Sequence, residues 1–129
     1  MSGSTGPPLV LVVDDVADIR DTCADYLELF RFRTATAVDG LDALHKAGEL
    51  HPDVILMDLA MPKLDGCEAT RRLKLDARTR DIPILAVTAE TGAGVRDRVR
   101  EVGCAGLMSK PVAPARLVEK IRELLAEPV

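Results

Sequence analysis

Short apolar runs alternate with longer amphipathic stretches along the whole chain. The apolar runs predict strands at 9–13, 33–38, 53–57, 82–87 and 106–109. Between and after them, apolar residues recur at helical spacing and predict helices at 18–30, 39–50, 67–75, 91–102 and 114–126. Strict alternation of strands and helices indicates an α/β fold, in which a parallel sheet is covered by helices on both faces.

The apolar positions within the helical patterns predict which helix faces are buried. In the first helix these positions are Ile19, Cys23, Tyr26, Leu27 and Phe30, and in the second Leu41, Leu44 and Leu50 lie on one side. In the fourth, Val95, Val99 and Val102 mark the buried face, although Gly92 and Gly94 lower its helix propensity.

Composition and charge restrict the class of protein. With 129 residues, 47% of them hydrophobic and 29% charged, the chain suits one folded domain, at 9–126 between a flexible lead (1–8) and a short tail (127–129). The net charge is −4 and the basic residues are scattered, so we expect no nucleic-acid binding. No apolar run approaches the roughly 20 residues of a membrane span, and the N-terminus lacks the pattern of a signal peptide. Three widely spaced cysteines indicate reduced thiols in a cytoplasmic protein.

Chemically functional residues follow the strands at the points where they end. Asp14 and Asp15 come after the first strand, Asp58 after the third, Thr88 after the fourth and Lys110 after the fifth. Sites in open α/β sheets lie beyond the carboxyl ends of the strands, so these side chains should converge. Adjacent carboxylates repel one another and are costly to bury, and a hard divalent cation together with a lysine would compensate them.

An aspartate after a strand is also a common helix N-cap, which is the simpler reading of Asp14 and Asp15. Asp18 competes for that role and would leave the pair free for a metal ion. The presence of the other strand-end residues favours the metal site.

The order of these residues resembles the receiver domain of two-component response regulators. The matching stretches are VVDD at 12–15, DVILMDLAMPKLDG at 53–66, PILAVTA at 83–89 and KP at 110–111. Each is common alone, but together they are specific, and the resemblance extends from Leu9 to about Ala126. It implies a flavodoxin-like, doubly wound sheet of five parallel strands in the order 2-1-3-4-5.

The resemblance also implies roles for the acidic residues. Asp58 would be the phosphoacceptor. Asp15, Asp58 and the backbone carbonyl of Ala60 would bind Mg²⁺ directly, and Asp14 would bind it through a water molecule. Magnesium prefers oxygen ligands and retains several waters, which fits this set.

The remaining strand-end residues would bind the phosphoryl group in such a domain. Thr88 would hydrogen-bond it, Lys110 would pair with its charge, and Ala89 would offer a backbone N–H. The peptide bond between Lys110 and Pro111 is often cis in the family.

The implied activity is signalling rather than enzymatic turnover. A sensor histidine kinase or a phosphotransfer protein would donate its phosphoryl group to Asp58, and the domain would catalyse only its own phosphorylation and dephosphorylation. The new charge would shift a pre-existing equilibrium and change the output face at 91–126, which contacts a downstream effector or an attached domain. Phosphorylation could also drive homodimerisation through that face.

Three positions depart from the family pattern. Many receivers carry an aromatic residue three positions before the lysine, where this chain has Leu107, so the signal should travel mainly through the helix at 91–102. Ala60 and Glu90 lie two positions after Asp58 and Thr88, and we expect them to tune autodephosphorylation.

Other functions fit the sequence less well. The chain could be the receiver piece of a hybrid histidine kinase or a transcription factor. A phosphatase of the haloacid dehalogenase type also uses aspartate, Mg²⁺, threonine and lysine, but it needs DxD where this chain has Val16, and an acidic pair after the lysine. A flavodoxin needs a phosphate loop after the first strand, and the acidic DDVADIR would repel phosphate.

Overall fold

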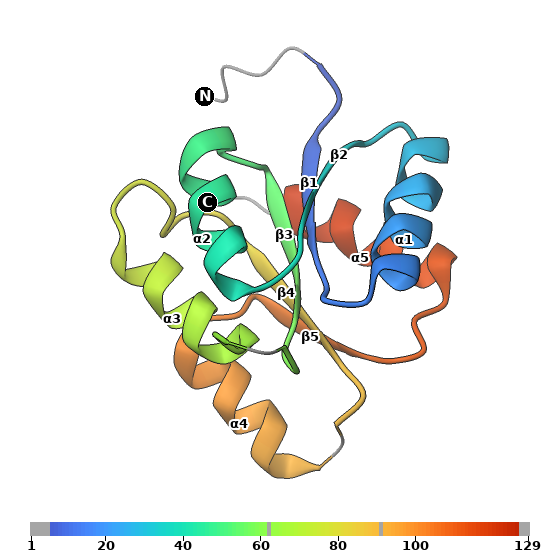
Figure 1. The fold of residues 1–129 in the computed structure, drawn as a ribbon. Coiled ribbons are helices and arrows are strands. Elements are labelled where there is room, and N and C mark those ends of the chain that lie inside the picture. The colour runs from blue at the N-terminus through green and yellow to red at the C-terminus, as the bar shows by residue number, and fades with distance from the viewer. Residues whose placement is uncertain (1–5, 62, 91, 127–129) are drawn as a thin grey trace.

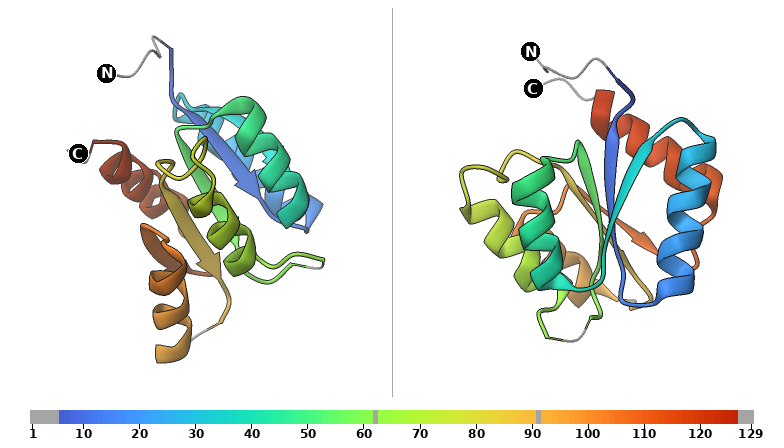
Figure 2. Two further views of the ribbon diagram at one scale, coloured as in Figure 1. Left: turned by 90° about the vertical axis from the view of Figure 1, so that its left-hand side faces the viewer. Right: turned by 45° about the horizontal axis from the view of Figure 1, so that its top comes forward.

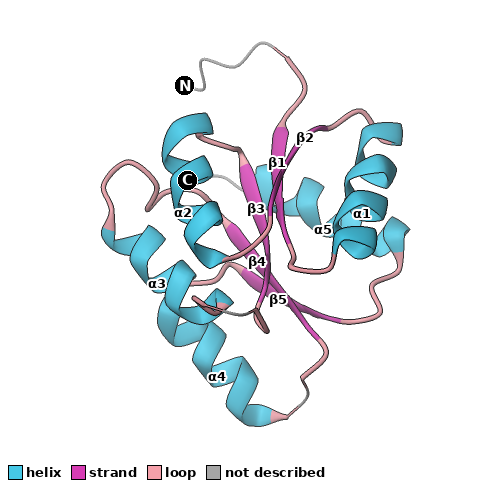
Figure 3. Ribbon diagram, viewed as in Figure 1, coloured by secondary structure: helices cyan, strands magenta, loops and turns pink. Residues whose placement is uncertain are grey.

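The computed structural model describes residues 6–61, 63–90 and 92–126, and it contains a five-stranded parallel sheet. The strands are β1 (Leu9–Val13), β2 (Arg33–Ala37), β3 (Val54–Asp58), β4 (Ile84–Thr88) and β5 (Gly106–Ser109). The helices are α1 (Ala17–Leu29), α2 (Gly40–Leu50), α3 (Gly66–Leu75), α4 (Ala93–Val102) and α5 (Pro114–Ala126). Each strand is followed by a helix, as Figure 3 shows.

The strands lie in the order β2-β1-β3-β4-β5, which confirms the predicted doubly wound topology. Helices α1 and α5 cover one face of the sheet, while α2, α3 and α4 cover the other (Figure 1). The two views of Figure 2 show these layers from other directions.

The strand period of two divides the core between the two faces. On β1, Val10 and Val12 belong to the cluster under α1 and α5, whereas Leu11 and Val13 belong to the cluster under α2 and α3. A smaller cluster of Leu59, Ala86, Val95 and Val99 anchors α4. Because both faces are covered, the central strands are apolar along most of their length.

The predicted element boundaries differ from the structure by one to two residues. Strand β4 begins at Ile84 rather than at 82, because Pro83 has no N–H to donate to the ladder. The predicted start of the fourth helix at Thr91 lies outside the described residues, as does Pro62 of the matching stretch at 53–66, and the described helix α4 begins at Ala93.

The predicted apolar face of α2 is wrong at two of its three leucines, whereas Leu44 is partly buried and packs against the core. Leu41 and Leu50 are 50% and 41% exposed, and the buried residues of this helix are Gly40, Ala43 and Ala47. Small side chains allow α2 to approach closely: a Cβ on Gly40 would lie 2.3 Å from the carbonyl oxygen of Leu64. Ile19 on α1 is likewise 47% exposed.

The domain limits of 9–126 remain a prediction. The Arg33 N–H and guanidinium donate hydrogen bonds to the carbonyls of Pro8 and Pro7, at 2.8 and 2.9 Å. These two prolines of the predicted lead therefore contact the edge of the sheet.

Candidate functional site

The sheet register brings the acidic residues of two strands to the same level. Val13 on β1 pairs with Met57 on β3, so the next residues, Asp14 and Asp58, emerge side by side. Asp15 follows in the turn to α1. The hydrophobic runs that bury β1 and β3 therefore also determine where the carboxylates meet.

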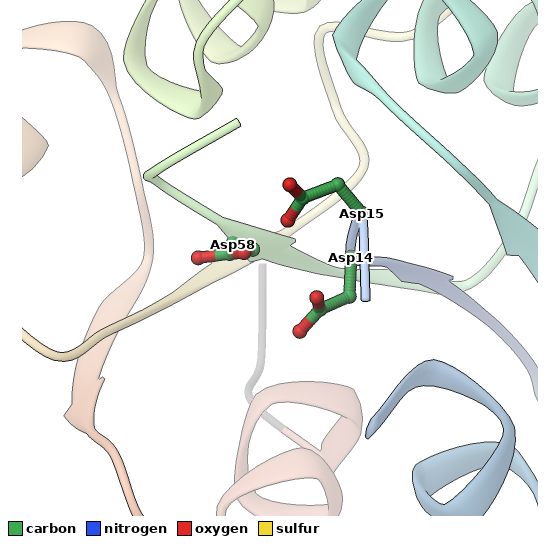
Figure 4. A group of neighbouring side chains, drawn as sticks. All are labelled: Asp14, Asp15 and Asp58. Atoms are coloured by element: carbon green, nitrogen blue, oxygen red, sulfur yellow. The ribbon is translucent and has the colours of Figure 1, made fainter. Parts of the chain in front are cut away.

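Three carboxylates cluster at this edge of the sheet. One oxygen from each of Asp14, Asp15 and Asp58 lies within 4.8 Å of the others. Figure 4 shows the three side chains leaving the ends of the neighbouring strands toward one space. Asp14 and Asp58 are each 5% exposed, whereas Asp15 is exposed. An oxygen-rich, partly buried set of this kind matches the donor chemistry of Mg²⁺.

Lys110 joins the cluster from the opposite end of the sequence. Its Nζ donates a hydrogen bond to Asp14 Oδ2 at 3.1 Å and lies 3.5 Å from Asp58 Oδ2. Burial lowers the pKa of Lys110, but the hydrogen bond to Asp14 and the charge of Asp58 outweigh it, so the pKa is raised. The ammonium group therefore compensates part of the negative charge. The Lys110–Pro111 peptide is cis, as expected.

The surroundings of Asp58 oppose its ionisation. Burial raises the pKa of this carboxyl; Lys110 and the Ala60 N–H lower it, and Asp14 and Asp15 raise it. The raised pKa reflects mainly the loss of water around the carboxyl, which Lys110 and the Ala60 N–H offset only in part. The Ala60 N–H donates to Asp58 Oδ1 at 3.2 Å.

The expectation that Asp18 caps the first helix is wrong, because the N-cap of α1 is Val16 and has no side-chain cap. Asp14 instead orders the turn that precedes this helix. Its Oδ1 accepts a hydrogen bond from the Val16 N–H at 2.9 Å, just before α1 begins. Asp18 lies in the first turn and does not cap the helix. Arg20 donates to the Asp14 carbonyl at 2.9 Å. One carboxylate can both order the helix start and face the cluster, because it has two oxygens with several lone pairs.

Thr88 ends β4 and is connected to the residues around it. It is 1% exposed, and its carbonyl accepts from the Lys110 N–H at 2.8 Å. Its Oγ1 accepts from the Glu90 N–H at 3.0 Å. Ala89 and Ala60 are exposed at the rim of the site.

Gly66, at the start of α3, packs against the backbone of Asp58. A Cβ at this position would lie 2.3 Å from the Asp58 carbonyl oxygen, so only glycine fits. The Gly66 N–H donates to the Leu59 carbonyl at 3.1 Å. In the sequence this glycine only ends the matching stretch at 53–66, and nothing there marks its contact with the site.

A cavity of about 670 Å³ opens beside the carboxylates, between α1 and the segment that links β5 to α5. Its walls are mostly apolar and include Ile19, Tyr26, Val112 and Leu117, with Lys110 at its polar end. The sequence analysis did not predict it, because it depends on how far apart two helices lie.

The fold and the cluster together define a class: a parallel α/β domain with an acidic cation site and a lysine at the carboxyl edge of its sheet. Comparison with known proteins is consistent with this class. Residues 10–122 match the family model described as the response regulator receiver domain. The chain belongs to this family.

Individual relatives agree with this assignment. The polar-differentiation response regulator DivK of Brucella ovis is 38% identical over 118 residues, covering 92% of this chain and 96% of that protein. The chemotaxis protein CheY4 of Vibrio cholerae superposes with a TM-score of 0.89 at 32% identity, covering 93% of this chain and all of the other.

A magnesium-bound relative is also similar. The receiver domain of the sensor histidine kinase PA1611 from Pseudomonas aeruginosa, with a magnesium ion coordinated in its active-site cleft, has a TM-score of 0.87 at 28% identity. The superposition covers 95% of the present chain and the whole of the PA1611 receiver domain. The protein is therefore a receiver-type signalling module, and the phosphatase and flavodoxin alternatives have no support. None of the described helices is both long and apolar enough to cross a bilayer.

Proposed function

We propose that Asp58 is the phosphoacceptor of this receiver domain. The observation that carries the proposal is the buried Asp58 carboxylate, which shares a 4.8 Å cluster with two other aspartates and lies 3.5 Å from Lys110. Asp58 is both nearly buried and close to a cation, and it ends the strand next to β1.

The residues around Asp58 fit a magnesium ion. Asp15, Asp58 and the Ala60 carbonyl would hold it, with Asp14 reaching it through a water molecule. When bound, the ion would neutralise negative charge on the carboxylates and on the incoming phosphoryl group. Three carboxylates share the site with one lysine ammonium, so an ion of this kind has negative charge to compensate.

The reaction is an in-line displacement at phosphorus. An Asp58 oxygen forms the new P–O bond while the P–N bond of a donor phosphohistidine breaks, and the electron pair leaves with the imidazole nitrogen. Lys110 pairs with the transferred oxygens, Thr88 donates its hydroxyl proton to one of them, and the Ala89 N–H faces another. Hydrolysis of the aspartyl phosphate by water returns the domain to its starting state.

The partners that we propose follow from this chemistry. A sensor histidine kinase or a phosphotransfer protein supplies the phosphoryl group, and the face built by α4, β5 and α5 contacts the effector. Leu107 packs beside the cluster that contains Val95 and Val99 of α4. Because leucine has no aromatic ring that could change rotamer on phosphorylation, we expect α4 to transmit the conformational change to the effector. We place the protein in the cytoplasm, which its three free cysteines support.

The direct test is incubation with acetyl phosphate and Mg²⁺, followed by intact-mass spectrometry. The wild-type chain should gain one phosphoryl group only when Mg²⁺ is present, and Asp58→Asn should gain none. Asp39→Asn is the matched control, because Asp39 also follows a strand and its capping bond to the Asp42 N–H survives as asparagine. Equal labelling of Asp58→Asn and Asp39→Asn would exclude Asp58.

Phosphorylation-dependent homodimerisation through the output face has its own test. Light scattering with and without beryllofluoride, a stable stand-in for the phosphoryl group, should show a doubled mass. An unchanged mass at all protein concentrations would argue against the dimer.

A further inference from the structure

Glu90 connects the switch threonine to α4 through two hydrogen bonds. Its backbone N–H donates to Thr88 Oγ1 at 3.0 Å, and its carboxylate accepts from Arg98 Nη2 at 3.0 Å. Arg98 lies in the second turn of α4, eight residues further along the chain. One residue therefore contacts both the hydroxyl that would hydrogen-bond the phosphoryl group on Asp58 and the helix of the output face.

Arg98 also reaches α3. Its guanidinium is near the Cys67 thiol at the start of α3; burial raises the pKa of Cys67 and the charge of Arg98 lowers it. Arg98 thus joins the loop after β4 to two helices. Its side chain is 51% exposed and that of Glu90 is 48% exposed, so the ion pair is accessible to salt.

The glycines at the start of α4 give this loop little support. Gly92 has φ of 113° and neither Gly92 nor Gly94 has an atom within 4 Å of its Cβ position. Among the described residues between β4 and α4, the Glu90–Arg98 contact is the sole hydrogen bond or ion pair from a side chain to α4. Leu107 supplies no aromatic ring that could support the loop.

We infer that Arg98 is a positioning residue that holds Glu90, and with it the Thr88 hydroxyl, in the resting conformation. The inference rests on the proposed function. For Thr88 to donate to a phosphoryl group on Asp58, its Oγ1 turns away from the Glu90 N–H, and the loop follows. The Glu90–Arg98 pair opposes that movement, so phosphorylation and the ion pair compete for the same loop.

The test is the equilibrium binding of beryllofluoride, with Mg²⁺, measured by calorimetry. Exposed ion pairs contribute about 0.2–1 kcal/mol, which corresponds to about 1.5- to 5-fold in a binding constant. Arg98→Gln should bind beryllofluoride more tightly than wild type by this factor. The binding constant of Arg98→Lys, which keeps the charge, should stay within 1.5-fold of the wild-type value. The matched control is Arg116→Gln, which breaks an equally short pair with Glu119 on α5 and should change nothing.

A coupling measurement separates this role from a general structural one. In a Glu90→Gln background, Arg98→Gln should have no further effect on binding, because the partner carboxylate is already gone. Raising the ionic strength should reduce the difference in beryllofluoride binding constant between wild type and Arg98→Gln, because salt screens exposed charges.

The outcomes that overturn the inference are specific. A change below 1.5-fold in Arg98→Gln, weaker binding, or an effect that persists in the Glu90→Gln background each refutes it. If Asp58→Asn fails to abolish beryllofluoride binding, then the proposed function fails instead. The two failures are distinguishable because the Arg98 variants keep the whole carboxylate cluster.

Discussion

Lys110 holds the carboxylate cluster together when no cation is bound, and replacing it with methionine tests this claim. Methionine keeps an unbranched stem of similar length and removes the charge together with the N–H groups that donate to Asp14. At an effective dielectric constant of about 20, charges separated by 3.1 and 3.5 Å attract by about 5 kcal/mol each. Desolvation offsets most of this attraction, and breaking one side of a buried pair costs about 3–5 kcal/mol.

The lysine side chain is 24% exposed, so we expect the lower end of that range, about 3 kcal/mol less stability in metal-free buffer. In an Asp58→Asn background only the pair with Asp14 remains to be broken, and the loss should fall to about 1.5 kcal/mol. The measurement is urea unfolding followed by circular dichroism, with EDTA and with Mg²⁺. Added Mg²⁺ should recover part of the loss.

The stability that Lys110→Met loses relative to wild type should also depend on pH, and the direction of this dependence follows from the two pKa shifts. The raised pKa of Lys110 means that its contribution is fully present below its ordinary value of 10.5 and is lost as pH rises through the folded value. The pKa of Asp58 is raised above its ordinary value of 3.8, so ionising it costs stability as pH rises through its folded value. Without Lys110 this cost grows, so the stability lost in Lys110→Met should be largest near pH 7 and should fall near pH 4 toward its value in the Asp58→Asn background.

Lys120→Met is the control for the loss of a lysine charge. Lys120 pairs with Glu123 at 3.7 Å on the surface of α5, and its loss should change stability by at most about 0.5 kcal/mol. If Lys110→Met were as stable as Lys120→Met in EDTA at pH 7, the lysine would not compensate the cluster, and the electrostatic account of the site would be refuted.

Three further predictions follow from other features of the fold. Gly66→Ala should lower the free energy of unfolding by about 1–3 kcal/mol, because its Cβ would lie 2.3 Å from a backbone carbonyl oxygen. Gly94→Ala, whose Cβ would meet open space, should raise it by up to about 1 kcal/mol. Equal urea midpoints for the two variants would contradict this. Burial raises the pKa of the Cys23 and Cys104 thiols to about 11. At pH 8 each thiol should therefore react with a disulfide reagent roughly 100-fold more slowly in the folded protein than in urea. Equal rates in the two conditions would show that the thiols are not shielded. Magnesium at 100 times its dissociation constant should stabilise the wild type against thermal unfolding by about 2.7 kcal/mol. The same concentration should stabilise Asp15→Asn by much less. Equal stabilisation of both proteins would show that Asp15 does not bind the ion.

The sequence by itself determined the order of elements and the residues of the cluster. Two-sided burial makes the central strands continuous apolar runs, and a charged residue that ends such a run is visible without coordinates. The alternation of Val10 and Val12 with Leu11 and Val13 fixes which face each residue covers, because strand geometry has a period of two.

Tertiary structure decided what depends on distances between elements. The burial of Gly40, Ala43 and Ala47 in place of the leucines on α2 follows from close packing against the loop after β3, which no pattern within the helix reports. Asp14 both accepts a hydrogen bond within the turn before α1 and belongs to the carboxylate cluster, and this double role required the real path of that turn.

The contacts of Gly66 with Asp58 and of Arg98 with Glu90 also belong to this second group. In the sequence a glycine in a turn and an arginine on a polar helix face look ordinary, since each gains its role only from a partner that another segment brings close. Local periodicity fixes which residues form an element, but side-chain contacts between elements depend on their separation and rotation, and these are set by packing over the whole sheet.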